Sequence, residues 1–134
     1  MPKTHEDLEG YLTKLERRFE RADDGTYLVA GAPNQPPIAV RLAPPVVVVR
    51  AEIGSAPQGD VPLEARLFRK LLELNASEML HASYAIDGAS IVLGSALELD
   101  NLDLNELEAV LADVDMAISE HVPALHELVQ KKAK

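Results

Sequence analysis

The sequence contains no cysteine, which excludes disulfide bonds, a cysteine nucleophile and thiolate metal ligands. It also lacks a long apolar run, because residues 46–49 fall far short of the ~20 that a membrane-spanning helix needs. Residues 1–7 are polar and lack the apolar core of a signal peptide. With 134 residues, 47% hydrophobic and 26% charged, we expect one soluble, cytoplasmic domain spanning residues 1–134.

Basic residues are missing from a long part of the chain. Residues 71–130 hold twelve acidic residues and no lysine or arginine, whereas residues 1–70 hold ten of each sign. The formal net charge is −9. Repulsion from phosphate groups disfavours nucleic acid and membrane surfaces as partners, whereas the acidic charge is compatible with a basic or amphipathic protein segment. A solvated acidic surface that keeps the protein soluble is the simpler explanation.

Helical spacing of apolar residues predicts three helices. The first spans residues 4–22, with Thr4 as N-cap and a stripe of Leu8, Tyr11, Leu12, Leu15, Phe19 and Ala22. The second spans residues 61–76 and is apolar around much of its circumference, which is typical of a buried helix or of half an interface. The third starts after Asn101, with Asp103 as its cap in a capping box with Glu106, and Pro123 is expected to kink or restart it. Its stripe could belong to a coiled coil, but we favour a helix lying on a sheet.

Three strands are predicted before the second helix and a hairpin after it. Residues 26–30, 38–42 and 46–53 read as strands, with prolines on both sides of the second, and residues 54–60 as a loop. Asp87-Gly88 predicts a two-residue type I′ turn that pairs Tyr84 with Ile91. The resulting order, α-β-β-β-α-β-β-α, predicts an α+β fold with a five-stranded, mostly antiparallel sheet packed with helices.

The hairpin register divides its residues between two faces. Apolar side chains, including Tyr84 and Ile91, form the core face. The other face is small and almost uncharged, and we expect it to bind a partner through Ser83, Ala85, Val92, Gly94 and Ala96, with Ser83 opposite Val92. An ordinary solvated face is the alternative.

Residues that could carry chemistry are few. His121 and His126 are five residues apart, which is poor metal-ligand spacing on a helix, and His121 fits the edge of an apolar stripe. Ser95 lacks the strand-turn-helix context of a nucleophile elbow. Four acidic residues read as turn, cap or solvent-facing positions, namely Asp100, Asp103, Asp113 and Asp115. We therefore expect no catalysis, no bound metal and no cofactor.

Residues 67–75, 82–87, 91–93 and 97–102 together form a pattern that resembles a known fold. A helix ending in Leu-x-x-Asn, here at Asn75, precedes a hairpin, an acidic leucine-containing turn and a long final helix. This pattern is similar to the type III secretion chaperone-like fold of the Tir chaperone (CesT) family and the YbjN family. The resemblance implies a non-enzymatic, usually dimeric protein. It implies either a chaperone that holds an extended segment of a secreted partner or a regulator of sensory transduction.

The sequence is compatible with two functions. The first is a chaperone-like module that captures an extended or amphipathic segment of a partner protein. The second is a homodimeric regulatory or scaffold protein without a client. In both cases we expect a homodimer, because the second helix carries more apolar surface than one buried side needs. The residues expected at that dimer interface are Leu67, Phe68, Leu71 and Leu72.

Overall fold

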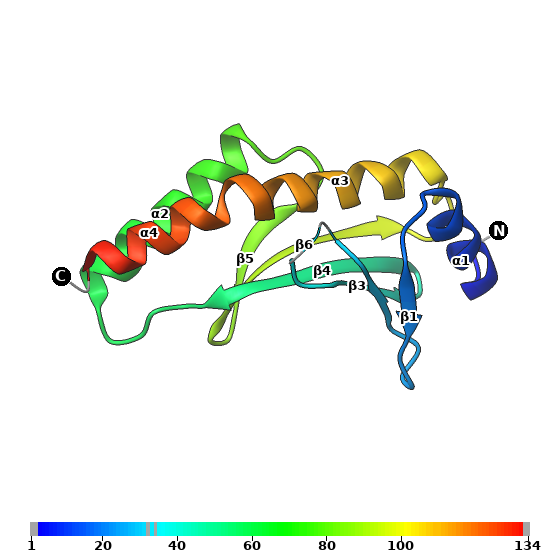
Figure 1. Ribbon diagram of the computed structural model, residues 1–134, viewed down its shortest axis with the longest axis horizontal. Helices are drawn as coiled ribbons and strands as arrows, with labels where there is room; N and C mark the ends of the chain where they lie inside the picture. Colours follow the sequence, from blue (N-terminus) through cyan, green and yellow to red (C-terminus); the bar gives the residue numbers. More distant parts are fainter. Residues whose placement is uncertain (1–2, 32, 34, 133–134) are drawn as a thin grey trace.

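The computed structural model describes residues 3–31, 33 and 35–132 (Figure 1). Its elements are, in chain order, α1 (His5–Lys14), β1 (Phe19–Arg21), β2 (Tyr27–Val29), β3 (Ile38–Ala43), β4 (Val46–Ser55), α2 (Val61–Ser77), β5 (Ser83–Asp87), β6 (Ser90–Glu98), α3 (Leu104–Glu120) and α4 (Val122–Lys132). The strands form one antiparallel sheet in the order β1-β2-β3-β4-β6-β5. The predicted α+β fold is confirmed, with six strands in place of five.

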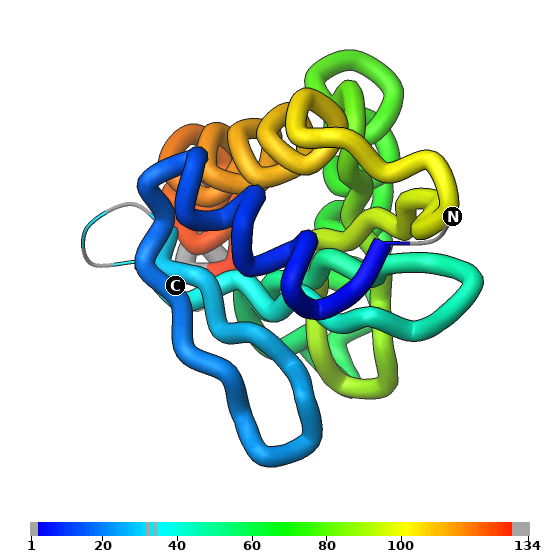
Figure 2. Tube along the Cα trace, turned by 90° about the vertical axis from the view of Figure 1, so that its right-hand side faces the viewer, coloured from blue at the N-terminus to red at the C-terminus, as the bar shows by residue number. Residues whose placement is uncertain are grey.

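The helices leave one face of the sheet uncovered. Figure 1 shows α2, α3 and α4 on one side of the sheet and α1 at the end where β1 lies. The core between these layers includes Val49 of β4, Leu93 of β6 and Leu111 of α3, all fully buried. On the opposite side, called here the free face, the β1–β2 and β5–β6 hairpins extend away from the helices (Figure 2).

The prediction of one helix over residues 4–22 is wrong in its second half, where β1 forms. Glu16 adopts a left-handed conformation with φ of 57°. Its N–H donates to the Thr13 carbonyl and the Arg17 N–H donates to the Leu12 carbonyl, each at 3.0 Å. These two bonds form a Schellman motif that ends α1. Because glutamate stands where glycine is usual, no glycine marks this helix end in the sequence.

Replacing Glu16 with glycine is expected to raise the free energy of unfolding by about 1 kcal/mol, because a residue without Cβ adopts the left-handed conformation without steric cost. Urea unfolding followed by circular dichroism measures the change. Glu20→Gly, on the exposed side of β1, is the matched control and should destabilise the protein instead. A Glu16→Gly protein no more stable than wild type would contradict the explanation.

The strands before α2 lie close to their predicted positions. β2 falls within residues 26–30, and β3 lies between Pro37 and Pro44 as expected from the missing proline N–H groups. β4 continues two residues past its predicted end, to Ser55, so the predicted loop over residues 54–60 is shorter.

The β5–β6 hairpin has a two-residue loop, but one residue later than predicted. Asp87 still belongs to β5 and pairs with Ser90, so the loop is Gly88-Ala89. Gly88, with φ of 60°, takes the first loop position, where type II′ turns place glycine. Tyr84 therefore pairs with Leu93 and not with Ile91. Because pairing shifts by two residues, each side chain keeps its predicted face.

The ends of α1 and α3 follow local sequence signals. Thr4 and Asp7 form a capping box at the start of α1, and Asp103 and Glu106 form another at the start of α3, as predicted for Asp103. The long final helix is interrupted at His121, so that α3 and α4 are separate helices. The break agrees with the effect expected of Pro123 on the preceding turn.

Candidate functional site

A shallow hollow on the free face brings together all five hairpin residues that the sequence singles out. Ser83 pairs with Gly94 and Ala85 pairs with Val92, so the predicted pairing of Ser83 with Val92 is wrong. Ala96 lies two residues beyond Gly94 on β6, opposite Val48 of β4. The hollow has a volume of about 490 Å³ and is called here the sheet hollow. Its lining is completed by Val48, Val49, Arg50, Ile86, Asp87 and Ser95.

The floor of the sheet hollow is backbone and small side chains. A Cβ at Gly94 would lie 3.3 Å from the Val49 carbonyl oxygen, so this glycine permits close contact between β6 and β4. Ala85 and Ala96 are exposed, whereas Val92 is only 6% exposed. Replacing Val92 with arginine would therefore bury a charge and disturb the fold. Another backbone could approach this floor closely.

Charges lie at the rim of the sheet hollow and not on its floor. Arg50 and Asp87 form an ion pair across the strands, and both side chains remain largely exposed. Glu52 accepts a hydrogen bond of 3.1 Å from the Ser90 hydroxyl. Exposed ion pairs contribute little to stability, so these groups can exchange partners at low cost. The sheet hollow thus combines an uncharged floor with positively and negatively charged side chains at its rim.

The four α2 residues expected at a dimer interface do not share one environment. Leu67 and Leu71 are buried in the core of their own chain. Phe68 is half-buried and Leu72 is 68% exposed. Leu72 belongs to a line of apolar residues along the outer side of α2, called here the α2 stripe: Val61, Ala65, Phe68, Leu72 and Ala76. Their spacing of three and four residues places them on one side of the helix.

Asn75 does not end its helix as the sequence suggested, because α2 continues to Ser77. Its side chain accepts a hydrogen bond from the Tyr84 N–H at 2.7 Å and donates one to the Tyr84 carbonyl at 3.2 Å. The amide thus occupies the outer edge of β5, the last strand of the sheet, as a neighbouring strand would. This contact blocks strand addition at that point of the edge.

Asp113 is buried, so its predicted position on the solvent side of the last helix is wrong. Its carboxylate accepts hydrogen bonds from the backbone N–H groups of Leu80, His81 and Ala82, at 3.2, 2.8 and 2.9 Å. These bonds fix the segment that leads into β5. Helical spacing could have indicated this burial, because Val110 and Ala117 lie three and four residues from Asp113 and are on the same buried side of α3.

The histidines form no common site. His121 is buried at the break between α3 and α4, and its Nδ1 lies 2.8 Å from the Tyr84 hydroxyl. Burial and the nearby Asp113 charge raise the pKa of Tyr84. His81 and His126 are exposed. In the part of the chain that the structure describes, no group of three or more potential ligands could hold a metal ion.

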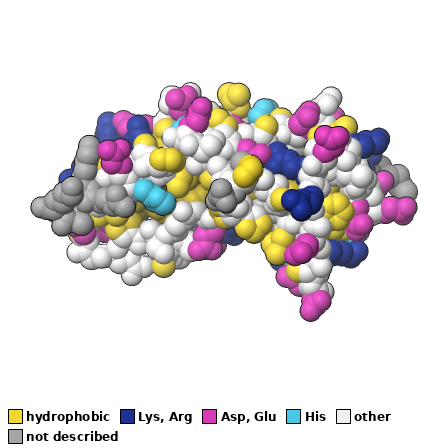
Figure 3. Space-filling model, in the orientation of Figure 1, with side chains coloured by type: hydrophobic (Ala, Val, Ile, Leu, Met, Phe, Trp, Pro, Cys, Tyr) yellow, Lys and Arg dark blue, Asp and Glu magenta, His cyan; other side chains and the backbone are white. Residues whose placement is uncertain are grey.

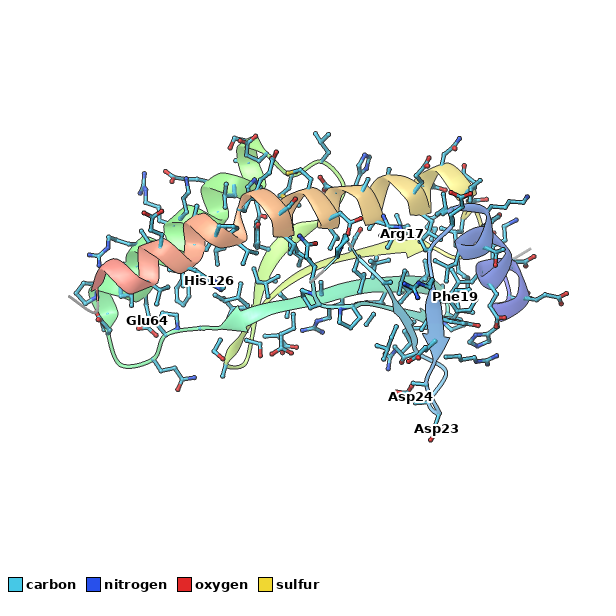
Figure 4. All side chains as sticks on the ribbon, viewed as in Figure 1. Arg17, Phe19, Asp23, Asp24, Glu64 and His126 are labelled. Atoms are coloured by element: carbon cyan, nitrogen blue, oxygen red, sulfur yellow. The ribbon has the colours of Figure 1, made fainter. Side chains whose placement is uncertain are left out.

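The remaining acidic residues have structural contacts. Asp115 forms an ion pair with Arg17 at 2.7 Å and thereby links α3 to the segment before β1. Figure 4 shows Arg17 beside α3. Asp103 caps α3, and Asp100 lies in the preceding turn. Ser95 lies within β6, opposite Val49, with no strand-turn-helix context. No helix in the described ranges is long and apolar enough to cross a membrane.

Comparison with solved structures finds the same fold in secretion chaperones. A chain of the heterodimeric ExoU–SpcU complex from the type III secretion system of Pseudomonas aeruginosa is 20% identical, with a TM-score of 0.68 over 87% of this chain and 95% of that one. A chain of the Yersinia pestis chaperone SycH in complex with a YscM2 fragment is also 20% identical, with a TM-score of 0.60 over 87% and 98%. YbjN from E. coli is 16% identical, with a TM-score of 0.62 over 88% and 90%.

The sequence itself has a family match. A search of curated proteins finds no match. The CesT_Tir_1 family model, in contrast, matches residues 1–131, nearly the whole chain. The resemblance inferred from the hairpin and the flanking helices is thus confirmed. By its sequence, and in keeping with the fold of its structural neighbours, the chain belongs to the CesT_Tir_1 family.

Proposed function

We propose that this protein is a non-catalytic chaperone-like module that captures an extended segment of a partner protein in the sheet hollow. The observation that carries the proposal is the uncharged floor of small residues on a sheet face that no helix covers. Desolvating such a floor costs little, and the absence of large side chains admits a second backbone. A cytoplasmic location, expected from the sequence, is part of this proposal.

The relatives support a protein partner. Three solved structures with this fold are protein complexes: ExoU–SpcU is a heterodimer, SycH is a chaperone bound to a fragment of YscM2, and HopA1–SchA is a chaperone–effector complex. In the protein described here, an extended segment could place alternate apolar side chains against Val48 and Ala96. Charged side chains of the same segment could meet Arg50 or Asp87 at the rim. An extended segment therefore suits both parts of the hollow.

The second candidate function is a homodimeric regulator without a client, and the α2 stripe favours it. Val61 and Leu72 are 72% and 68% exposed, which is unusual for large aliphatic residues on one side of a helix. We propose that the α2 stripe forms a homodimer interface in either case. The two functions make different demands on the sheet hollow. A client must bind in it, whereas a scaffold protein can leave it exposed to solvent.

The double variant Ala85→Arg/Ala96→Arg tests the client-binding function. Both alanines are exposed, so the protein should fold, while two long cationic side chains fill the hollow and abolish partner capture. Pull-down from the native host, quantified by mass spectrometry, and binding of the dye ANS to the folded protein measure the effect. The matched control is Ala112→Arg/Ala124→Arg, on exposed positions of α3 and α4.

The proposal requires that wild type and the α3/α4 control retain the same partners and that the hollow variant loses them. A hollow variant that stays folded and keeps every partner and its dye binding would show that the face is only solvated. The scaffold function would then be the better explanation.

A further inference from the structure

A second hollow lies between α3, the segment before β1 and the connection from β2 to β3. It has a volume of about 610 Å³, which is in the size range of small-molecule sites. Figure 4 labels Arg17 just below α3, and Figure 3 shows basic side chains exposed at the same place. The hollow is called here the Asp115 cleft, and its lining includes Glu16, Arg17, Arg18, Gly31, Gln35 and Asp115.

Two side-chain oxygens of the Asp115 cleft are buried without a hydrogen-bond donor. They are Oδ1 of Asp115 and Oε1 of Gln35, and no donor among the described residues reaches either of them. The Arg17 guanidinium pairs with the other carboxylate oxygen of Asp115, Oδ2, at 2.7 Å. Buried polar groups are nearly always hydrogen-bonded, because an acceptor removed from water loses its solvation. The two oxygens therefore favour a ligand that brings its own donors.

Gly31 leaves open the space that these oxygens surround. A Cβ at this position would lie 3.3 Å from Asp115 Oδ1, 3.5 Å from the Pro36 carbonyl oxygen and 4.0 Å from Gln35 Oε1. Three acceptors thus gather around one point beside the glycine, and each accepts a hydrogen bond at about 2.9 Å. A primary ammonium group has three N–H donors and a positive charge, so it matches three acceptors of which one is a carboxylate.

The charges of the Asp115 cleft favour a zwitterion over a free cation. Glu16 and Asp115 contribute two negative charges, and Arg17 and Arg18 contribute two positive charges. A divalent metal ion would find a single carboxylate that Arg17 already compensates, which is a poor set of ligands. Arg18 is exposed and, within the described ranges, forms no ion pair. Its guanidinium can therefore bind a carboxylate group with two parallel hydrogen bonds.

We propose that the Asp115 cleft binds a small amino acid as a zwitterion, with its ammonium group among the Asp115, Gln35 and Pro36 oxygens and its carboxylate at Arg18. The ligand would supply donors to both buried oxygens. It would also join α3 to the connection between β2 and β3, because its ammonium group bonds to both. The proposal goes beyond capture of a partner protein and does not depend on it, since the Asp115 cleft and the sheet hollow share no lining residue.

Three probes that differ in the spacing of their charged groups test the proposal: glycine, 4-aminobutyrate and 6-aminohexanoate. Each is added up to about 20 mM to isotopically labelled protein, because ligands of so few atoms bind with a Kd of about 1 mM. At least one should produce saturable shifts of the Gly31 N–H and Gln35 side-chain NH₂ resonances in NMR spectra. Its trimethylammonium counterpart, which has no N–H, should bind at least tenfold more weakly. No saturable shift with any probe, or equal binding of the counterpart, would overturn the proposal.

Gly31→Ala removes the space that the ammonium group needs, because its Cβ would crowd Asp115 Oδ1. Gly10→Ala is the matched control, since Gly10 is exposed on α1 and a Cβ there would meet no other described atom within 4 Å. Gly31→Ala should weaken binding of the best probe at least tenfold, whereas the control should bind like wild type. If Gly31→Ala does not fold, Gln35→Met decides the outcome, because it removes an acceptor and keeps the length of the side chain. Wild-type affinity in the folded variant would contradict the proposal.

Arg18→Gln separates the contributions of the two ends of the ligand. It should weaken binding of the best probe at least fivefold and leave the weaker binding of butylamine, which has no carboxylate, unchanged. If butylamine binds wild type as tightly as the best probe, the cleft recognises an ammonium group alone, such as that of a lysine side chain, and an amino acid is the wrong ligand.

Two further measurements exclude other sites and other ligands. Calcium chloride alone should not shift the Gly31 and Gln35 resonances, and the same saturable shifts with this salt would indicate a metal site and overturn the proposal. The double variant Ala85→Arg/Ala96→Arg should bind the best probe like wild type. Loss of binding in that variant would place the probe in the sheet hollow and would also overturn the proposal, whether or not the variant still captures clients.

Discussion

Asp113→Ala is expected to lower the free energy of unfolding by about 3 kcal/mol or more, because three backbone N–H groups lose a charged acceptor and two of the bonds are short. Asp113 is 7% exposed, so water cannot freely replace the carboxylate. For a domain whose total stability is about 5–15 kcal/mol, such a loss is a large fraction. Urea unfolding followed by circular dichroism measures it.

Two further variants make the result specific. Asp113→Asn keeps one acceptor oxygen without the charge and should lose less stability than Asp113→Ala. Glu108→Ala, at an exposed position of the same helix, should change stability by no more than about 0.5 kcal/mol. The three bonds hold the segment before β5, where Leu80 is 83% exposed. An Asp113→Ala protein as stable as the Glu108→Ala control would show that the segment is held by other contacts.

Features that depend on short-range sequence patterns could be predicted. The sequence predicts Thr4 as an N-cap and Asp103 as part of a capping box, because both signals depend only on residues within one helical turn. Pro123 interrupts the final helix through its own covalent geometry. The side-chain faces of β5 and β6 followed from the two-residue period of a strand, so the five residues of the sheet hollow were grouped correctly.

Features that depend on tertiary contacts could not be predicted in the same way. Glu16 ends α1 in a conformation that its residue type disfavours, and β1 forms because β2 pairs with it. Asp87 stays in β5, where its carboxylate meets Arg50, and this shifts the hairpin turn by one residue. Asn75 bonds across to Tyr84, a contact that residue type alone did not indicate. In each case a partner distant in sequence outweighs a local preference.

Leu72→Glu is expected to convert a homodimer into a monomer. Leu72 is the most central of the large exposed residues of the α2 stripe. A symmetric dimer would bury two copies of this leucine, one from each chain. Losing two buried leucines costs about 3 kcal/mol or more, which corresponds to at least a hundredfold weaker dimer, and a buried carboxylate adds to that cost. Light scattering after gel filtration should give twice the 14.6 kDa chain mass for wild type at tens of micromolar.

Leu28→Glu is the matched control, because Leu28 is also an exposed leucine but lies on β2, away from α2. This variant should remain dimeric, whereas Leu72→Glu should elute as a folded monomer with an unchanged circular dichroism spectrum. Substituting Leu67 or Leu71 would not test the interface, since both are buried in the core of their own chain. A wild-type protein that is monomeric at this concentration would remove the homodimer from both proposed functions. A dimer unaffected by Leu72→Glu would instead place its interface outside the α2 stripe, and the exposed leucine would then be available to a different protein.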